Sequence, residues 1–299
     1  MTQQHRIASL SDRAAREREY MERYGLKVLI NCLSGGVDSS AAAAISKQAA
    51  PDGTVALILP CSTEEELEGE RLQDIVDAER VARHLGIPAV TINLSDLWDM
   101  AVTLYSAAAR ELAAKAGLPL EEERLQWAIN NLKPTLRIMT AGFFADAFRG
   151  LMVGTGNGVE YFLGYFSIRG DGISDRQPIR DCTKAEVRRL AAEAGLPDDL
   201  VNRVPTAGLW PGQTDEGELG FSYADADRLL VWLLERHLKS PVLSTTLTVL
   251  EEAVEAILAD PDLPVQPEVA RRIIAQNRRT EFKRRPGDLE EMLKRRGLV

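Results

Sequence analysis

The sequence has few cysteines and histidines, and it has no long apolar segment. Its three cysteines, Cys32, Cys61 and Cys182, lie far apart without a Cys-x-x-Cys pair, so the sequence predicts neither a disulfide framework nor a zinc site. No stretch approaches the roughly 18 uncharged apolar residues that span a bilayer, and the N-terminal residues contain no signal-peptide core. We therefore expect a cytoplasmic protein with no membrane partner.

An excess of positive charge is also missing. The 299 residues include 36 Lys and Arg against 45 Asp and Glu, which gives a net charge of -9. Binding to nucleic acid irrespective of sequence requires a surface rich in unpaired Lys and Arg, so we expect no nucleic-acid partner. With 45% hydrophobic residues, the chain is long enough to bury the core of one large domain over residues 1–299.

The most informative segment is a serine and glycine turn between a strand-like run, residues 27–33, and a helix-forming run, residues 40–50. The turn consists of Ser34, Gly35, Gly36, Val37, Asp38 and Ser39. Glycines let backbone N–H groups approach an anion, and the following helix adds its positive N-terminal end, so the turn predicts a phosphate site. It lacks the spacing and the lysine of a Walker A loop. Asp38 beside phosphates instead indicates a bridging Mg²⁺.

Strand-like and helical segments alternate along the first half of the chain. Residues 54–60, 89–94 and 151–154 are strand-like, and the acidic run 64–85 is helical. This alternation predicts an α/β fold with an open parallel sheet. A further helix is expected over residues 9–24, before the first strand.

The remaining segments are predicted to be mostly helical. An apolar helix is expected over residues 94–116, and Pro134 in the first turn of the next helix places a loop at residues 130–134. Three C-terminal helices are expected over residues 222–238, 242–259 and 268–279. We therefore predict one domain with a motif-bearing core, residues 25–223, and a helical extension, residues 224–299.

A second glycine turn, residues 154–158, follows the fourth strand. Thr155 lies in this turn, and Glu160 lies one helical turn later. Ligands of open α/β sheets bind at the carboxyl ends of the strands, so both turns are expected there, with Glu160 facing Asp38 across a metal ion. Taken alone, Glu160 is better interpreted as a solvated residue at a helix start. Thr183 begins a capping box, and Lys184 opposes the helix dipole there, which makes it a candidate phosphate ligand.

Together these motifs resemble the ammonia-dependent NAD synthetase family over residues 25–223. The resemblance rests on both glycine turns, Thr183 with Lys184, and residues 131–137, 164–175 and 205–216. In that family, ATP adenylates the nicotinate carboxylate of deamido-NAD and releases pyrophosphate, and ammonia then displaces AMP to give NAD. The resemblance implies the adenine-nucleotide α-hydrolase-like fold, a ligase that uses ATP and Mg²⁺, and a homodimer with the acyl-substrate site at the subunit interface.

The resemblance also assigns roles to residues. Asp38 and Lys184 are expected to be catalytic, and Asp38 and Glu160 to bind Mg²⁺. The turn of residues 34–39 is expected to bind pyrophosphate. The other positions that match ATP contacts are Thr155, Lys184 and Thr206.

Three positions on the acyl-substrate side depart from the family pattern. Thr135 replaces an arginine, Ile168 a lysine and Phe282 a histidine. The positions retained or adjacent on that side are Arg137, Arg169, Asp175 and Lys283. Each lost charge-assisted contact weakens binding of the dinucleotide by about 1.5–3 kcal/mol. The departures favour a second hypothesis, a paralogue that adenylates a different carboxylate in a specialised pathway.

Two further hypotheses concern different classes of protein. A sulfur-inserting pyrophosphate-loop ATPase commonly needs a reactive cysteine, and Cys182 is the candidate near the site. A nucleotide-binding protein without activity is disfavoured by the presence of Asp38, Glu160 and Lys184.

The source of nitrogen is a separate question. About 25 residues precede the first strand, too few for the amidase domain of glutamine-dependent members. We therefore expect free ammonia, or a separate glutaminase, as the nitrogen donor.

Overall fold

The computed structural model describes residues 8–61, 70–204, 214–237, 242–244 and 246–284. The chain divides into two compact units. The first unit consists of Met1–Asn157 and Phe166–Glu218, and the second of Gly158–Tyr165 and Leu219–Val299. The predicted C-terminal extension falls in the second unit, which also takes a segment from the middle of the chain. Within the described ranges, none of the helices combines the length and the apolar composition that crossing a membrane requires.

The first unit contains a parallel sheet of four strands. These are β1 (Leu29–Cys32), β2 (Thr54–Ile58), β3 (Ala89–Thr91) and β4 (Leu151–Val153). Their order is β3-β2-β1-β4, and each neighbouring pair is parallel. Leu29 of β1 pairs with Thr54 on one side and with Leu151 on the other, so β1 is an interior strand. The prediction of an open parallel α/β sheet is confirmed.

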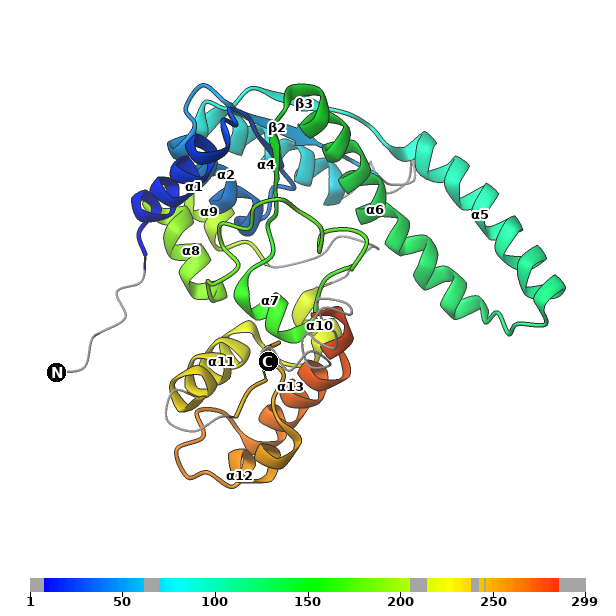
Figure 1. Cartoon of the computed structure of the whole chain (residues 1–299), viewed down its shortest axis with the longest axis vertical. Helices are drawn as coiled ribbons and strands as arrows, with labels where there is room; N and C mark the ends of the chain where they lie inside the picture. The colour runs from blue at the N-terminus through cyan, green and yellow to red at the C-terminus, as the bar shows by residue number, and fades with distance from the viewer. Residues whose placement is uncertain (1–7, 62–69, 205–213, 238–241, 245, 285–299) are drawn as a thin grey trace. The chain divides into compact units, whose positions relative to one another are not determined.

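Helices cover both faces of this sheet (Figure 1). Leu29 and Ile58 face a cluster that includes residues of α1, α2, α4 and α8, whereas Ile30 and Leu57 face a cluster built largely with α6. Side chains alternate along a strand, so a sheet buried on both faces needs apolar residues at consecutive positions. The bounds of the helices are α1 Leu10–Tyr24, α2 Val37–Ala49, α4 Glu70–Leu85, α5 Ser95–Ala116, α6 Glu122–Phe148, α8 Lys184–Glu193, α9 Asp198–Val201 and α10 Asp215–Leu219.

Sequence signals fix the ends of two helices in this unit. The Ser9 hydroxyl accepts a hydrogen bond from the Asp12 N–H at 3.1 Å, and the Thr183 hydroxyl accepts one from the Glu186 N–H at 3.2 Å. Each acidic side chain returns a bond to the backbone of the capping residue, which completes a capping box. The helix predicted over residues 9–24 and the helix start predicted at Thr183 are confirmed.

Helix α6 differs from the prediction, because it runs from Glu122 to Phe148 with Pro134 in its interior. The loop predicted over residues 130–134 is wrong. An interior proline removes one backbone hydrogen bond and costs about 3 kcal/mol or more. Tertiary packing offsets this cost here, since Pro134 is buried and a Cβ built on Gly170 would lie 2.7 Å from the Pro134 Cβ. Helices α5 and α6 lie side by side (Figure 1).

The second unit is helical and has its own apolar core. Phe162 of α7 is fully buried in one cluster with Leu233 of α11 and Ile273 of α13. Asn277 is also fully buried, and its amide donates to the carbonyls of Phe162 and Leu247. The elements of this unit are α7 Gly158–Leu163, α11 Tyr223–His237, η1 Glu251–Ala253, α12 Val254–Leu258, α13 Pro267–Arg279 and η2 Glu281–Lys283.

The helix predicted over residues 242–259 is wrong in its first half. Leu243 and Val249 form an antiparallel bridge, and helical structure begins only at Glu251. The hydroxyls of Ser244, Thr246 and Thr248 are within hydrogen-bond distance of one another in sequence order, at 2.8 and 3.2 Å. Such local side-chain bonds compete with the helical backbone pattern.

Candidate active site

In the turn of residues 34–39, Ser34, Gly35 and Gly36 lead from the interior strand β1 to α2 at the carboxyl end of the sheet, and Asp38 and Ser39 lie in the first turn of α2. Gly35 has a φ of 77°, a left-handed conformation that glycine adopts without steric cost. The hydroxyls of Ser34 and Ser39 lie 3.1 Å apart, and Ser39 donates to the Gly36 carbonyl at 3.0 Å. The hydroxyls thus brace the turn at the N-terminus of a 13-residue helix, where backbone N–H groups attract an anion.

Asp38 receives two buried side chains from distant parts of the first unit. Lys184 is 2% exposed, and its ammonium group contacts Oδ2 of Asp38 as an ion pair. The Asn157 amide, fully buried, donates to Oδ1 of Asp38 at 2.9 Å. Burial of an ammonium group is costly unless it is paired, so this geometry fixes Lys184 beside the phosphate turn. Two residues that the sequence placed in one site, Asp38 and Lys184, are therefore in direct contact.

Asn157 has no role in the sequence-based assignment, although it stands in the second glycine turn. The register explains its position, because β1 and β4 are neighbours and Asn31 pairs with Val153. The adjacent turns therefore bring Asn157 to Asp38, and the prediction that the two strands end side by side is confirmed. In the sequence Asn157 stands between Gly156 and Gly158. An amide side chain in such a turn is the signal that could have indicated a hydrogen-bond donor to Asp38.

The other predicted ATP contacts have different positions. Thr155 is half-buried in the second glycine turn. This turn follows β4, which neighbours β1, the strand that leads to Asp38. Thr206 lies outside the described residues. Their contacts with ATP stay predictions.

Glu160 belongs to α7 of the second unit, where the Tyr223 hydroxyl donates to its Oε1 at 3.3 Å. The prediction that Glu160 faces Asp38 across a metal ion stays a prediction. In the described part of the chain, no group of three His, Cys, Asp or Glu side chains is arranged to hold a metal ion. Mg²⁺ at phosphate sites usually takes one or two carboxylates together with substrate phosphates, and Asp38 at the phosphate turn fits that arrangement.

Comparison with known proteins identifies the family to which the chain belongs. A sequence model of the NAD synthase family matches residues 10–287. The chain belongs to this family. An NH3-dependent NAD+ synthetase from Carboxydothermus hydrogenoformans is 38% identical over 214 residues, which cover 72% of this chain and 81% of that protein. The family prediction made from the motifs is confirmed.

Solved structures of similar proteins share the fold of this family member. The structure of NMN synthetase from Francisella tularensis has a TM-score of 0.65 at 24% identity, over 93% of this chain and 97% of that one. The NH3-dependent NAD synthetase from Campylobacter jejuni has a TM-score of 0.63 at 17% identity, over 92% and 94%. At these identities the likeness concerns the fold, and it supports the predicted adenine-nucleotide α-hydrolase-like architecture.

Two positions that the family pattern gives to the acyl substrate lie on α6. The Thr135 hydroxyl donates to the Asn131 carbonyl at 2.9 Å, one turn earlier in the helix. The Arg137 guanidinium donates through Nε to the Leu59 carbonyl at 3.1 Å. Arg137 therefore anchors α6 beyond the end of β2 with one nitrogen, and a role toward the substrate stays a prediction for both residues.

The acyl-substrate positions that follow the second glycine turn are exposed. Ile168 and Arg169 stand next to each other on the surface of the first unit. The Asp175 carboxylate accepts a hydrogen bond from the Met152 N–H at 2.8 Å, which ties this segment to β4. Arg169 thus offers an exposed cation one position away from the lysine that the family pattern has at Ile168.

The last two acyl-substrate positions lie in the second unit. Phe282 is 63% exposed, and Lys283 donates through Nζ to the Gly164 carbonyl at 2.8 Å. That carbonyl lies at the C-terminal end of α7, where a positive charge is electrostatically favourable. Lys283 thus has a structural contact, and its predicted substrate contact stays untested.

Replacing Cys182 by alanine is expected to leave turnover unchanged. Cys182 is 1% exposed, and burial raises the pKa of its thiol to about 12, so at neutral pH the nucleophilic thiolate is absent. We expect a steady-state kcat within about twofold of wild type and a loss of stability of about 1 kcal/mol, typical of a core truncation. A large loss of turnover in a folded Cys182→Ala variant would instead support sulfur chemistry.

Proposed function

We propose that this chain forms NAD+ from deamido-NAD, ATP and ammonia and releases AMP and pyrophosphate. The observation that carries the proposal is the buried contact of Lys184 with Asp38 beside the phosphate turn. A cation and a carboxylate, the groups that phosphate oxygens and Mg²⁺ need, in contact beside the turn support phosphate binding there. The similarity to the NH3-dependent NAD+ synthetase from Carboxydothermus hydrogenoformans supports the choice of acyl substrate and of ammonia.

The first step is adenylation of the nicotinate carboxylate. One carboxylate oxygen attacks the α-phosphorus of ATP, and the bond from that phosphorus to the oxygen bridging the β-phosphorus breaks. Lys184 and the N–H groups at the start of α2 stabilise the negative charge on the leaving pyrophosphate. Asp38 and Glu160 would hold Mg²⁺, which neutralises phosphate charge when bound. Thr155 and Thr206 would contact the nucleotide.

The second step forms the amide. The ammonia nitrogen attacks the acyl carbon of the adenylate, the bond from that carbon to the AMP oxygen breaks, and the nitrogen loses a proton. Arg137, Arg169, Asp175 and Lys283 would orient the dinucleotide for both steps. We propose that the exposed Arg169 supplies the positive charge that the family pattern places at Ile168, whereas Thr135 and Phe282 contribute no charge.

The direct test measures all products of one reaction. Purified protein is incubated with ATP, Mg²⁺ and ammonium, with and without deamido-NAD, and NAD+, AMP and pyrophosphate are quantified by mass spectrometry and enzymatic coupling. We expect equal amounts of the three products. Nicotinate mononucleotide, the acid that corresponds to NMN, is tested in parallel because one structural relative is named an NMN synthetase.

The outcomes separate the candidate functions. Pyrophosphate released with another carboxylate, and none with deamido-NAD, would identify a paralogue with a different acyl substrate. ATP binding without pyrophosphate release from any acid would contradict an enzymatic role. Glutamine in place of ammonium is expected to give no NAD+ unless a separate glutaminase is added.

We also propose a homodimer, because α5 and α6 expose large apolar side chains. Leu104 is 59% exposed, Leu112 62% and Phe143 68%, and all three lie on these two adjacent helices. Burying such side chains against a second copy is favourable at about 25 cal/mol per Å². Light scattering of the purified protein is expected to give twice the chain mass of 33.0 kDa. A Phe143→Glu variant is expected to shift the mass toward the monomer.

The proposed reaction would take place in the cytoplasm. ATP is the energy source of the reaction, and Cys32, Cys61 and Cys182 form no disulfide in the described part of the chain, which suits a reducing compartment. Fluorescence microscopy of a tagged chain in its own cells is the measurement that checks this location.

A further inference from the structure

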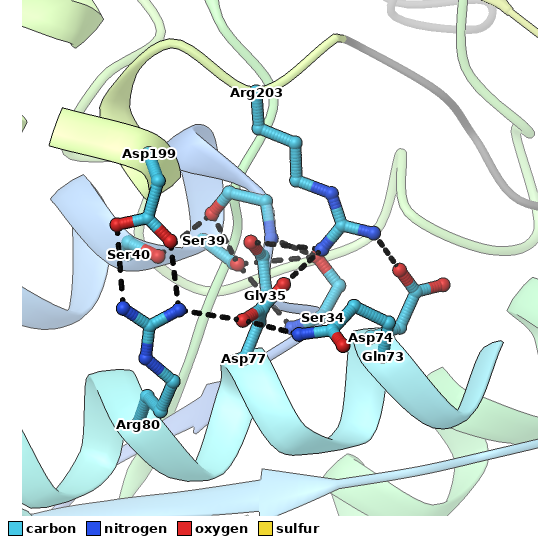
Figure 2. Close-up of polar contacts among 11 residues, drawn as sticks. Ser34, Gly35, Ser39, Ser40, Gln73, Asp74, Asp77, Arg80, Asp199 and Arg203 are labelled. Carbon is cyan, nitrogen blue, oxygen red and sulfur yellow. Dashed lines mark hydrogen bonds and ion pairs between the residues drawn. The ribbon is translucent and has the colours of Figure 1, made fainter. Parts of the chain in front are cut away.

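A network of two arginines and three aspartates joins α4 to the phosphate turn and to α9 (Figure 2). Arg80 lies on α4 and contacts Asp77 of the same helix and Asp199 of α9. Arg203 follows α9 and contacts Asp74 and Asp77 of α4. All five residues belong to the first unit. The network therefore connects three segments that are distant in sequence but adjacent to the candidate active site.

Asp77 is the centre of this network. Its side chain is 7% exposed, and its carboxylate accepts hydrogen bonds from Gln73 at 3.0 Å, Arg80 at 3.0 Å and Arg203 at 3.1 Å. A buried carboxylate is stable only with such donors, so Asp77 holds both arginines in place. The hydrogen bond from Arg80 also lowers the pKa of the Asp199 carboxyl, because the guanidinium favours the ionised form.

The two arginines differ in one respect that bears on the site. Arg203 donates from Nη1 to the carbonyl of Gly35 at 3.4 Å, in addition to its two carboxylate partners. Arg80 donates to Asp77 and Asp199 and, among the residues that the structure describes, forms no hydrogen bond with the turn of residues 34–39. Figure 2 shows the Arg203 side chain reaching between Gly35 and Asp74.

The phosphate turn lies directly against α4 at this point. A Cβ built on Gly35 would lie 2.8 Å from the Asp74 carbonyl oxygen and 3.0 Å from the Asp77 Cβ. The peptide between Gly35 and Gly36 is planar and trans, so its carbonyl and its N–H point in opposite directions. Holding the Gly35 carbonyl on the side of α4 therefore keeps the Gly36 N–H on the opposite side. There it donates a hydrogen bond to the Ser34 hydroxyl at 3.3 Å.

We propose that Arg203 is a positioning residue for ATP binding, which clamps the Gly35 carbonyl to α4 and thereby orients the N–H groups of the phosphate turn. This inference rests on the proposed function, because it takes ATP to be the ligand of that turn. Preorganised donors bind an anion better than donors that must reorient, since the cost of ordering is met before binding.

The test compares Arg203→Gln, Arg203→Lys and the matched control Arg80→Gln. Calorimetry measures the Kd of a non-hydrolysable ATP analogue with Mg²⁺, and kinetics measure KM for ATP and for the acyl substrate. We expect Arg203→Gln to raise the Kd and the KM for ATP about tenfold, the size of one charge-assisted contact. Arg203→Lys keeps the charge but loses the planar fork, so we expect partial rescue, with a Kd about threefold above wild type.

The control separates positioning from stability. Both arginines bridge two carboxylates, so thermal unfolding is expected to change by similar amounts in Arg203→Gln and Arg80→Gln. Only Arg203→Gln should weaken ATP binding, while Arg80→Gln stays within about twofold of wild type, and the KM for the acyl substrate should not change in either. Equal Kd values for the two glutamine variants would overturn the role of Arg203.

The outcomes also distinguish this proposal from the proposed function. If the wild-type protein binds the ATP analogue but makes no NAD+, the proposed function fails while the binding comparison still decides the role of Arg203. If the wild-type protein binds no ATP analogue, both are overturned.

Discussion

Replacing Lys184 by methionine is expected to lower the rate of pyrophosphate release by about a hundredfold to a thousandfold, as for other positioned donors at a developing anion. Methionine keeps much of the volume of the buried lysine stem and removes the ammonium group. The loss has two consequences, because the leaving pyrophosphate loses a cation and Asp38 loses its buried ion-pair partner. Single-turnover release of pyrophosphate at saturating ATP is the measurement.

Arg189→Met is the matched control for Lys184→Met. Arg189 lies on the same helix, α8, and forms a partly exposed ion pair with Glu193 at 3.2 Å. Ion pairs of this kind contribute about 0–1 kcal/mol, so we expect normal turnover and nearly unchanged unfolding. If Lys184→Met folds, as judged by circular dichroism, and keeps a rate within about threefold of this control, the assignment of Lys184 to the active site is wrong.

Gly35→Ala is expected to produce the second large effect, on both stability and ATP binding. A left-handed φ costs a non-glycine residue about 1–2 kcal/mol. The new methyl group would also meet the Asp74 carbonyl oxygen at 2.8 Å, and a helix backbone cannot yield as a flexible side chain does. Overpacking adds about 1–3 kcal/mol, and relieving it moves the turn away from α4. We expect the Kd of the ATP analogue to rise by more than about tenfold.

Gly25→Ala isolates the contribution of packing in this comparison. Gly25 ends α1 with a φ of 66°, close to the 77° of Gly35, but among the described residues a Cβ built there would lie within 4 Å of no atom beyond its chain neighbours. It therefore carries the conformational cost alone, and ATP affinity should be unchanged. Urea unfolding measures both stabilities. Equal losses of stability in the two variants, with normal ATP binding, would show that contact between the turn and α4 is unimportant.

Local signals in the sequence predicted much of the fold. Ser9 and Thr183 each determine a helix start through contacts within three residues, and the alternation of apolar strands with helices determined a parallel sheet. Local features also singled out Asp38 in the glycine turn and Lys184 at a helix start, and the resemblance to a family assigned catalytic roles to both. Their contact spans 146 residues, so no local pattern shows it.

The wrong loop at residues 130–134 and the missed roles of Asn157 and Arg203 have a common physical cause. Pro134 is a strong local signal for a helix start, yet burial against Gly170 keeps it inside α6. Asn157 and Arg203 act through partners more than 100 residues away in the sequence, Asp38 in one case and Asp77 in the other. In each case tertiary contacts decide the outcome, and a single sequence does not display them.

The strand order has a consequence for how the chain folds during synthesis. β1 pairs with β2 soon after both emerge, but its other edge is paired by β4, which begins at Leu151. At about 5–20 residues per second, the ribosome needs on the order of ten seconds to complete the intervening segment. During that interval β1 presents an open edge, which is a site for mispairing or chaperone contact. We therefore expect the nucleotide site to form late in folding, after Asn157 and then Lys184 have made their contacts with Asp38.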